Sequence, residues 1–143
     1  MTRIQYPHYN FRIKEEEDKE WIFDEIRKLW VRLTPEEWVR QNLLQYLTQV
    51  KQYPAALIAV EKEILLGELR KRFDILVYRE ARPWMIIECK EMNVPLTEAV
   101  IRQVLNYNIA VQANYIMVSN GTENHGFSLA NGQAEPIDIL PDF

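Results

Sequence analysis

The stretch Phe73–Lys90 (FDILVYREARPWMIIECK) decides the fold, because two runs rich in β-branched and aromatic residues are joined there by a short polar connection. Phe73–Tyr78 and Trp84–Lys90 are predicted to be strands. Arg79–Pro83 is short enough to join them directly. The stretch therefore predicts an antiparallel hairpin.

The two sides of this hairpin can be aligned if it folds symmetrically about its midpoint. Asp74 then lies opposite Glu88, and Tyr78 lies opposite Trp84. Side chains alternate between the two faces of a strand, so Asp74, Glu88 and Lys90 are expected on one face. Directly opposed residues have Cβ atoms about 4.5–5.5 Å apart, which places the two carboxylates next to each other.

Two opposed carboxylates repel each other, and burial makes that repulsion more costly. Both faces of the hairpin are apolar, so Asp74 and Glu88 are not ordinary surface charges. They need a counter-charge, either the amine of Lys90 or a divalent cation. Mg²⁺ prefers such oxygen ligands and keeps water and substrate phosphate in its other positions. The simpler alternative is a structural ion cluster of these three side chains.

The elements before the hairpin are an expected meander, a helix and a strand. Tyr9–Leu33 predicts a small antiparallel β-meander, and Leu57–Val60 predicts a strand that extends toward Leu66. The segment Thr34–Glu37 is a capping box with proline at the first helical position. The helix that it begins is expected to reach about Tyr53, with an apolar stripe formed by Val39, Leu43, Leu47 and Val50.

The elements after the hairpin are a second helix and three strands. Thr97 is expected to cap a helix from Glu98 to about Gln112, and Tyr115–Ser119 reads as a buried strand. Phe127–Leu129 and Ala134–Ile137 predict a short terminal hairpin. This order predicts an α/β (α+β) fold, in which helices flank a mixed β-sheet and a small antiparallel meander precedes it.

Length and composition limit the classes of protein. The 143 residues fit a single domain, with the meander in 1–33, a core in 34–121 and a terminal hairpin and tail in 122–143. The net charge of −4 excludes a basic coat for nucleic acid over the whole surface. One cysteine excludes a disulfide framework. No apolar run is long enough to span a membrane, so a cytoplasmic protein is expected.

Asp74, followed after thirteen residues by Glu88-Cys89-Lys90, resembles the D…ExK core of the PD-(D/E)xK nucleases. The surrounding segments resemble the N-terminal nuclease domain of type I restriction enzyme R subunits, above all its small stand-alone bacterial members. The resemblance extends from about Thr34 to Gly121, and its segments, in order, are 36–41 (EEWVRQ), 60–62 (VEK), 72–75 (RFDI), 87–90 (IECK), 102–107 (RQVLNY) and 118–121 (VSNG).

The resemblance implies a restriction-endonuclease-like fold and Mg²⁺-dependent hydrolysis of DNA, as an endonuclease in restriction or DNA processing. Asp74 and Glu88 would hold Mg²⁺ or Mn²⁺, together with the backbone carbonyl of Cys89, whose side chain is expected in the core. Lys90 would be the catalytic lysine, which orients or deprotonates the attacking water or stabilises developing charge.

On the first helix, the resemblance implies that Glu37 is a further acidic residue near the metal, with Glu36 as the competing choice. An equally good interpretation is that Glu37 only completes the capping box with Thr34.

On the second helix, Gln103 and Tyr107 match the family's Q-x-x-x-Y element and would contact the substrate backbone near the metal. The alternative is a polar pair that packs this helix on the sheet. Arg40 and Arg72 are further expected DNA contacts, although Arg72 equally fits a solvated face.

DNA is the expected partner, with a second copy of the chain or restriction-modification subunits as possible others. No P-loop motif is present, so the chain is not expected to translocate DNA. The alternative function is a non-catalytic subunit that binds nucleic acid or protein on a nuclease scaffold.

Overall fold

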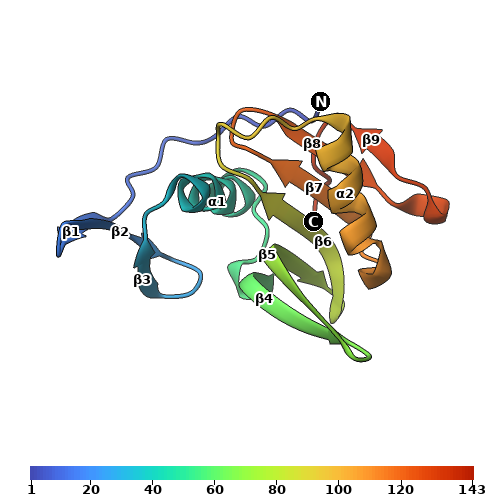
Figure 1. Cartoon of the computed structure of the whole chain (residues 1–143), viewed down its shortest axis with the longest axis horizontal. Helices are drawn as coiled ribbons and strands as arrows, with labels where there is room; N and C mark the ends of the chain where they lie inside the picture. Colours follow the sequence, from blue (N-terminus) through green and yellow to red (C-terminus); the bar gives the residue numbers. More distant parts are fainter.

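The computed structural model describes the backbone of residues 1–143 and every side chain except that of Asn131. A three-stranded and a six-stranded β-sheet lie on either side of the first helix (Figure 1). The strands are β1 (Ile13–Glu16), β2 (Lys19–Asp24), β3 (Leu29–Arg32), β4 (Ile58–Leu66), β5 (Leu69–Arg79), β6 (Arg82–Cys89), β7 (Tyr115–Ser119), β8 (Asn124–Ser128) and β9 (Glu135–Ile137). The helices are α1 (Pro35–Gln45) and α2 (Glu98–Asn108), with a π-helical turn at Tyr46–Val50 and 3₁₀ turns at Ala55–Leu57, Ile109–Val111 and Ala130–Gly132.

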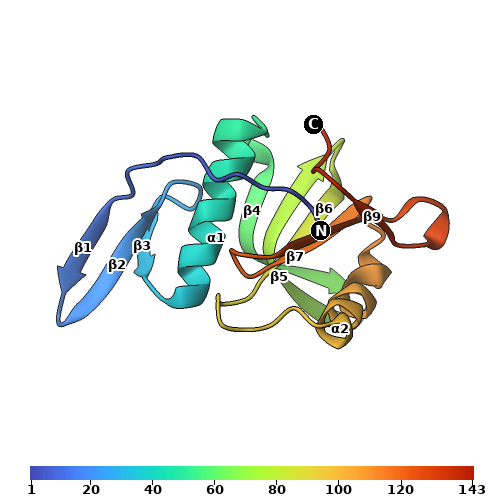
Figure 2. The ribbon, with the colours of Figure 1, turned by 90° about the horizontal axis from the view of Figure 1, so that it is seen from above.

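The larger sheet has the order β4-β5-β6-β7-β8-β9, and β6 and β7 are its parallel pair. The α2 helix connects these two strands and covers one face of the sheet, whereas α1 covers the other (Figure 2). The three-stranded sheet lies beyond α1. The predicted α+β class, with a mixed sheet flanked by helices and preceded by a meander, is confirmed. Neither helix in the described chain is long and apolar enough to cross a membrane.

The central hairpin has the predicted register along most of its length. Ile75 lies opposite Ile87 and Leu76 lies opposite Ile86. The register then shifts between Val77 and Tyr78, so that Tyr78 pairs with Pro83 and the predicted pairing with Trp84 is wrong. The reason is a tight two-residue turn at Glu80-Ala81, whose φ angles of 53° and 62° suit a hairpin and leave one extra residue on β6.

The first helix begins as predicted and ends early. The hydroxyl of Thr34 accepts a hydrogen bond from the amide of Glu37 at 3.0 Å, which caps the helix. Val39, Leu43 and Leu47 are buried, but Val50 is 48% exposed. The expected stripe fails at Val50 because the π-helical turn Tyr46–Val50 is wider than an α-turn and changes the direction of the side chains that follow.

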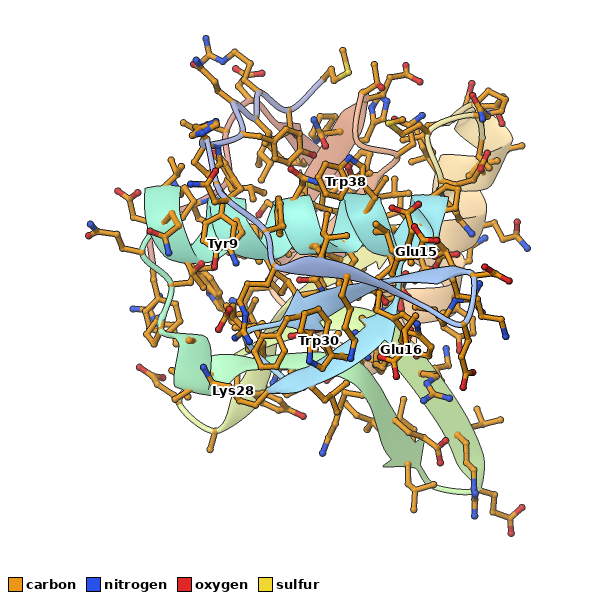
Figure 3. All side chains as sticks on the ribbon, turned by 90° about the vertical axis from the view of Figure 1, so that its left-hand side faces the viewer. Tyr9, Glu15, Glu16, Lys28, Trp30 and Trp38 are labelled. Atoms are coloured by element: carbon orange, nitrogen blue, oxygen red, sulfur yellow. The ribbon has the colours of Figure 1, made fainter. Side chains whose placement is uncertain are left out.

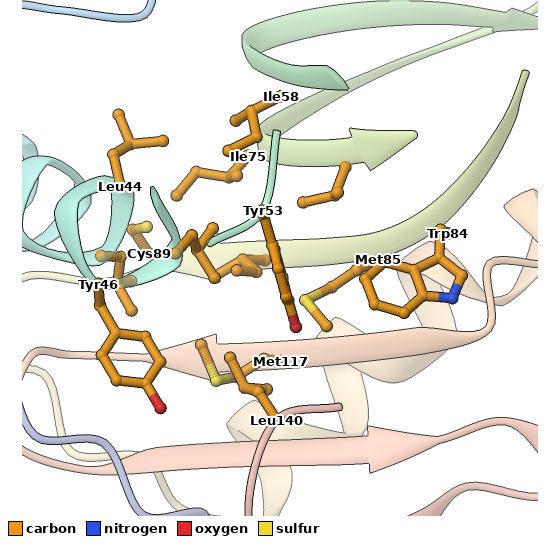
Figure 4. Packing of buried hydrophobic residues seen from close by; sticks show 14 of the residues in the cluster. Leu44, Tyr46, Tyr53, Ile58, Ile75, Trp84, Met85, Cys89, Met117 and Leu140 are labelled. Carbon is orange, nitrogen blue, oxygen red and sulfur yellow. The ribbon is translucent and has the colours of Figure 1, made fainter. Parts of the chain in front are cut away.

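The core on the α1 side of the sheet is partly aromatic (Figure 4). Tyr53 packs edge-on against Trp84, with ring centroids 5.4 Å apart. Cys89 is buried in the same core, as expected for a structural cysteine. This packing fixes the end of β6 beneath α1, and the side chains flanking Cys89 belong to the candidate site.

Candidate active site

Asp74, Glu88 and Lys90 meet at the open end of the β5–β6 hairpin. Asp74 Oδ2 accepts a hydrogen bond from the amide of Cys89 at 2.7 Å, which ties the two strands together. Lys90 Nζ lies 3.8 Å from Glu88 Oε1. The amide of Lys90 donates to the carbonyl of Ser119 at 2.8 Å, so β7 holds the backbone that carries Lys90. The structure therefore brings the three side chains together.

The ionised forms of the Asp74 and Glu88 carboxyl groups are electrostatically unfavourable in this environment. Burial, reinforced by the neighbouring Asp74 and opposed by Lys90, raises the pKa of Glu88 to about 7. Burial also raises the pKa of Asp74, although the Cys89 amide and the Arg40 guanidinium act against it. A raised pKa means that the ionised form is disfavoured, here mainly because burial removes water from each carboxylate and, for Glu88, also because Asp74 lies beside it. This is the property expected of a pair that binds a cation.

Arg40 is buried beneath the site and does not have the exposure that a DNA contact requires. Its side chain is 5% exposed, and Nη1 lies 2.5 Å from Glu61 Oε1. Nη2 lies 3.5 Å from Asp74 Oδ1. The DNA contact expected of Arg40 is not supported, because surrounding carboxylates already occupy its guanidinium. Arg40 instead supplies positive charge from the α1 side.

The neighbouring residues Glu36 and Glu37 have different environments. Glu36 is half exposed and faces the site, where burial and Asp74 raise the pKa of its carboxyl. Glu37 is buried next to Arg27 and accepts a hydrogen bond from Gln41 at 3.0 Å. Glu37, the residue expected near the metal, therefore belongs to a structural network, and the competing choice, Glu36, is the acidic residue at the site.

A cavity of about 230 Å³ opens between this site and α2. Gln103 and Tyr107 line it on consecutive turns of α2, as their spacing predicted. Arg72 lies on the opposite wall with its side chain 65% exposed and with Nε 2.8 Å from Glu61 Oε2. The predicted polar residues of α2 thus border the same space as Glu88 and Lys90. A nucleic-acid backbone in this cavity would meet hydrogen-bond donors and positive charge.

Two residues of the site are not among those predicted from the sequence. The first is Glu61, whose carboxylate joins Arg40 to Arg72. Its φ of 55° is unusual for a non-glycine residue in a strand, and no sequence signal marks it. Asn108 lines the cavity, and its buried Oδ1 has no hydrogen-bond partner among the described atoms. Asn108 follows Val104 and Val100 at helical spacing, which could have indicated it.

In the described part of the chain, no three His, Cys, Asp or Glu side chains are arranged to hold a metal ion. Any ion at Asp74 and Glu88 would therefore need backbone, water or substrate oxygens to complete its coordination, which is the usual situation of Mg²⁺.

Comparisons with known proteins identify the family. No curated protein matches the sequence. One similar solved structure is a fragment of a putative HsdR subunit of a type I restriction enzyme from Vibrio vulnificus YJ016, with 19% identity and a TM-score of 0.47. The match covers 65% of this chain but only 21% of that chain.

The family model described as "Type I restriction enzyme R protein N terminus (HSDR_N)" matches residues 35–141. This range is more than half of the 143 residues and contains α1, the β5–β6 hairpin and α2. The chain therefore belongs to the type I restriction enzyme R protein N-terminal family.

Proposed function

We propose that this protein is a Mg²⁺-dependent endonuclease that hydrolyses DNA phosphodiester bonds in restriction or DNA processing. The observation that carries the proposal is the meeting of Asp74, Glu88 and Lys90 beside the cavity that opens toward α2, with the pKa of both carboxyls raised. Structural ion pairs normally stabilise the charged form, whereas this pair is short of positive charge.

The donor set fits the metal. The carboxylates of Asp74 and Glu88 and the carbonyl of Cys89 are the hard oxygen ligands that Mg²⁺ or Mn²⁺ prefers. A bound ion would polarise the scissile phosphate and lower the pKa of the attacking water. It would also supply the positive charge that the two carboxylates lack.

The residues around the carboxylates have separate roles in this proposal. The Lys90 ammonium group orients the attacking water and stabilises the negative charge that develops on the phosphate. Glu36 adds negative charge at the α1 edge of the site. Gln103 and Tyr107 position the substrate backbone from α2, and Arg72 contacts a phosphate at the cavity wall.

The proposal is tested by cleavage of linear, circular, branched and methylated DNA in Mg²⁺ or Mn²⁺. We expect Asp74→Asn, Glu88→Gln and Lys90→Met each to abolish cleavage while circular dichroism shows an intact fold. Glu63→Gln is the matched control, because Glu63 is an exposed carboxylate on β4 that lies outside the site. Failure of the wild type to cut any DNA or RNA substrate would refute the enzymatic proposal.

The second candidate is a non-catalytic subunit that binds nucleic acid or a protein. The observation that favours it is that Arg40, 3.5 Å from Asp74, and Lys90, 3.8 Å from Glu88, supply positive charge to the carboxylates without a metal. Calorimetric titration with Mg²⁺ or Mn²⁺ alone separates the two. Metal binding that is lost in Asp74→Asn supports the nuclease, and no binding to the wild type supports the subunit.

In either role we propose DNA as the ligand and the cytoplasm as the location. Restriction-modification subunits are the partners that family membership favours, and a second copy of this chain is the alternative.

A further inference from the structure

The outer face of the three-stranded sheet carries aromatic rings and cations that the proposed active site does not use (Figure 3). Lys14 lies opposite Trp21, Trp21 lies opposite Arg32, and Phe23 lies opposite Trp30. Directly opposed side chains share a face of the sheet, so these five form one surface. Each of the three rings is only partly buried. We call this surface the outer face of the meander.

In a protein core, apolar side chains would cover these rings. Here cationic side chains lie over them. The guanidinium carbon of Arg12 is 4.3 Å from the centroid of Phe23 and 5.5 Å from that of Trp30. Lys14 Nζ is 4.6 Å from the centroid of Trp30. Phe23 and Trp30 contact each other edge to face, with centroids 5.4 Å apart. Rings and positive charges are therefore interleaved on one surface.

The outer face is positively charged although the whole chain has a net charge of −4. The guanidinium carbon of Arg32 lies 5.8 Å from the ring centroid of Trp21. Lys19 lies on the same face, because side chains alternate between the two faces of β2. Glu16, which pairs with Lys19 in the sheet, is a carboxylate on this face, and Lys14 Nζ lies 2.9 Å from it. With Arg12, the face carries four cations and is bordered by two carboxylates, Glu16 and Glu17, which share a hollow with Trp21 and Trp30. It therefore complements a negatively charged ligand.

We propose that the outer face of the meander binds an unpaired DNA strand, with phosphates on the cations and bases on the rings. Interleaved cations and aromatic rings are the two elements by which proteins bind single strands without sequence readout. An acidic protein segment would satisfy the cations but leave the rings uncovered. The DNA strand supplies both kinds of contact, so we favour it.

The position of the face relates it to the candidate site. The meander precedes residues 35–141, which the family model covers, so this surface is additional to the family domain. Arg32 ends β3 four residues before Glu36, which faces the candidate site from the first turn of α1. Binding on the outer face does not require hydrolysis, so it can be measured independently of the proposed nuclease activity.

The experiment is fluorescence anisotropy of a short labelled oligodeoxythymidine, titrated with the full chain in EDTA at low salt. We expect Trp30→Ala and Arg12→Gln each to weaken binding about tenfold, because stacking and phosphate contacts are lost. Trp30→Phe keeps a ring and should retain most of the affinity. Arg79→Gln is the matched control, since the guanidinium of Arg79 also lies over aromatic rings, 5.7 Å from the centroid of Trp84 and 5.5 Å from that of Phe143, but at the far turn of the central hairpin.

Three outcomes would overturn the proposal. Wild-type affinity in Trp30→Ala and Arg12→Gln, with circular dichroism showing a folded chain, would locate binding elsewhere. Equal weakening by Arg79→Gln would show that only overall charge matters. Competition by poly-glutamate as strong as that by unlabelled oligodeoxythymidine, together with no effect of Trp30→Ala, would indicate an acidic protein ligand.

Discussion

Two clusters of charged side chains lie on opposite sides of α1, and they differ in how their charges are compensated. On the meander side, Asp24 is fully buried and accepts four hydrogen bonds, from the amides of Ile26 and Arg27 and from the side chains of Arg27 and Gln41. Burial opposes its ionisation, but these hydrogen bonds outweigh burial and lower the pKa of Asp24.

On the sheet side, the side chains of Asp74 and Glu88 are 13% and 24% exposed, against 0% for Asp24, yet the pKa of each is raised. The positive charge available from Lys90 and Arg40 lies at 3.8 and 3.5 Å, beyond good hydrogen-bond distance. The difference shows that burial alone does not identify a carboxylate as functional. A satisfied cluster stabilises the fold, and an under-compensated cluster retains the capacity to bind a ligand.

The largest expected difference between the two clusters is in the free energy of unfolding after one carboxylate is removed from each. Asp24→Ala leaves the Arg27 and Gln41 side chains without their partner, and we expect it to lower the free energy of unfolding by about 3–5 kcal/mol. Asp74→Asn removes a repelling charge, so in EDTA we expect no loss of stability beyond about 0.5 kcal/mol. Urea denaturation measures both. Equal destabilisation by the two substitutions would contradict the distinction.

The pH dependence of the free energy of unfolding should also differ between the two clusters. The pKa of Glu88 is about 7 in the folded protein, against an ordinary value of 4.5, so the folded state holds a proton that the unfolded state has lost. Its contribution to stability is complete below about pH 4.5 and is lost as the pH rises through 7. Each pKa unit corresponds to about 1.4 kcal/mol. The contribution of Glu88 to the free energy of unfolding is therefore at most about 3 kcal/mol, and solvent screening makes it smaller.

Urea denaturation in EDTA between pH 4.5 and 8 measures this loss, and Glu88→Gln should remove most of it. Asp24 acts in the opposite direction, because its lowered pKa gives stability that is lost as the pH falls. A wild-type profile that is flat between pH 4.5 and 7 while Glu88→Gln leaves it unchanged would show that Glu88 is not perturbed.

The smallest expected effects come from two adjacent residues that the helix directs into different clusters. Glu37→Gln weakens a buried ion pair with Arg27, and we expect a loss of about 1–2 kcal/mol of stability with DNA cleavage unchanged. Glu36→Gln should leave stability within about 0.5 kcal/mol and lower Mg²⁺ affinity in calorimetry. If Glu36→Gln instead lowered stability and Glu37→Gln lowered Mg²⁺ affinity, Glu37 would be the acidic residue of the site.

Local sequence signals predicted the framework well. The alternation of apolar residues in β5 and β6 predicted the hairpin and the proximity of Asp74 to Glu88, because strand periodicity is a local property. Thr34 and Thr97 marked the starts of both helices, and each side chain caps its helix. The Gln103 and Tyr107 spacing predicted a shared helix face, and both line the cavity.

Other features were not predicted from the sequence. The extra residue of β6 arises from the geometry of a two-residue turn, which shifted Tyr78 against Pro83. The π-helical turn after α1 exposed Val50. The bridge formed by Glu61 between Arg40 and Arg72 joins residues from β4, α1 and β5. No local pattern reports such a bridge, because its members are distant in the sequence.

By itself the sequence determined where most strands and helices form and which acidic side chains of the hairpin lie close together. The tertiary structure decided which of Glu36 and Glu37 faces the site, because the rotation of α1 is fixed by the packing of Val39 and Leu43 against the sheet. It also decided that Arg40 points inward to Asp74 and Glu61. Local periodicity specifies a face of an element, but only packing specifies what that face meets.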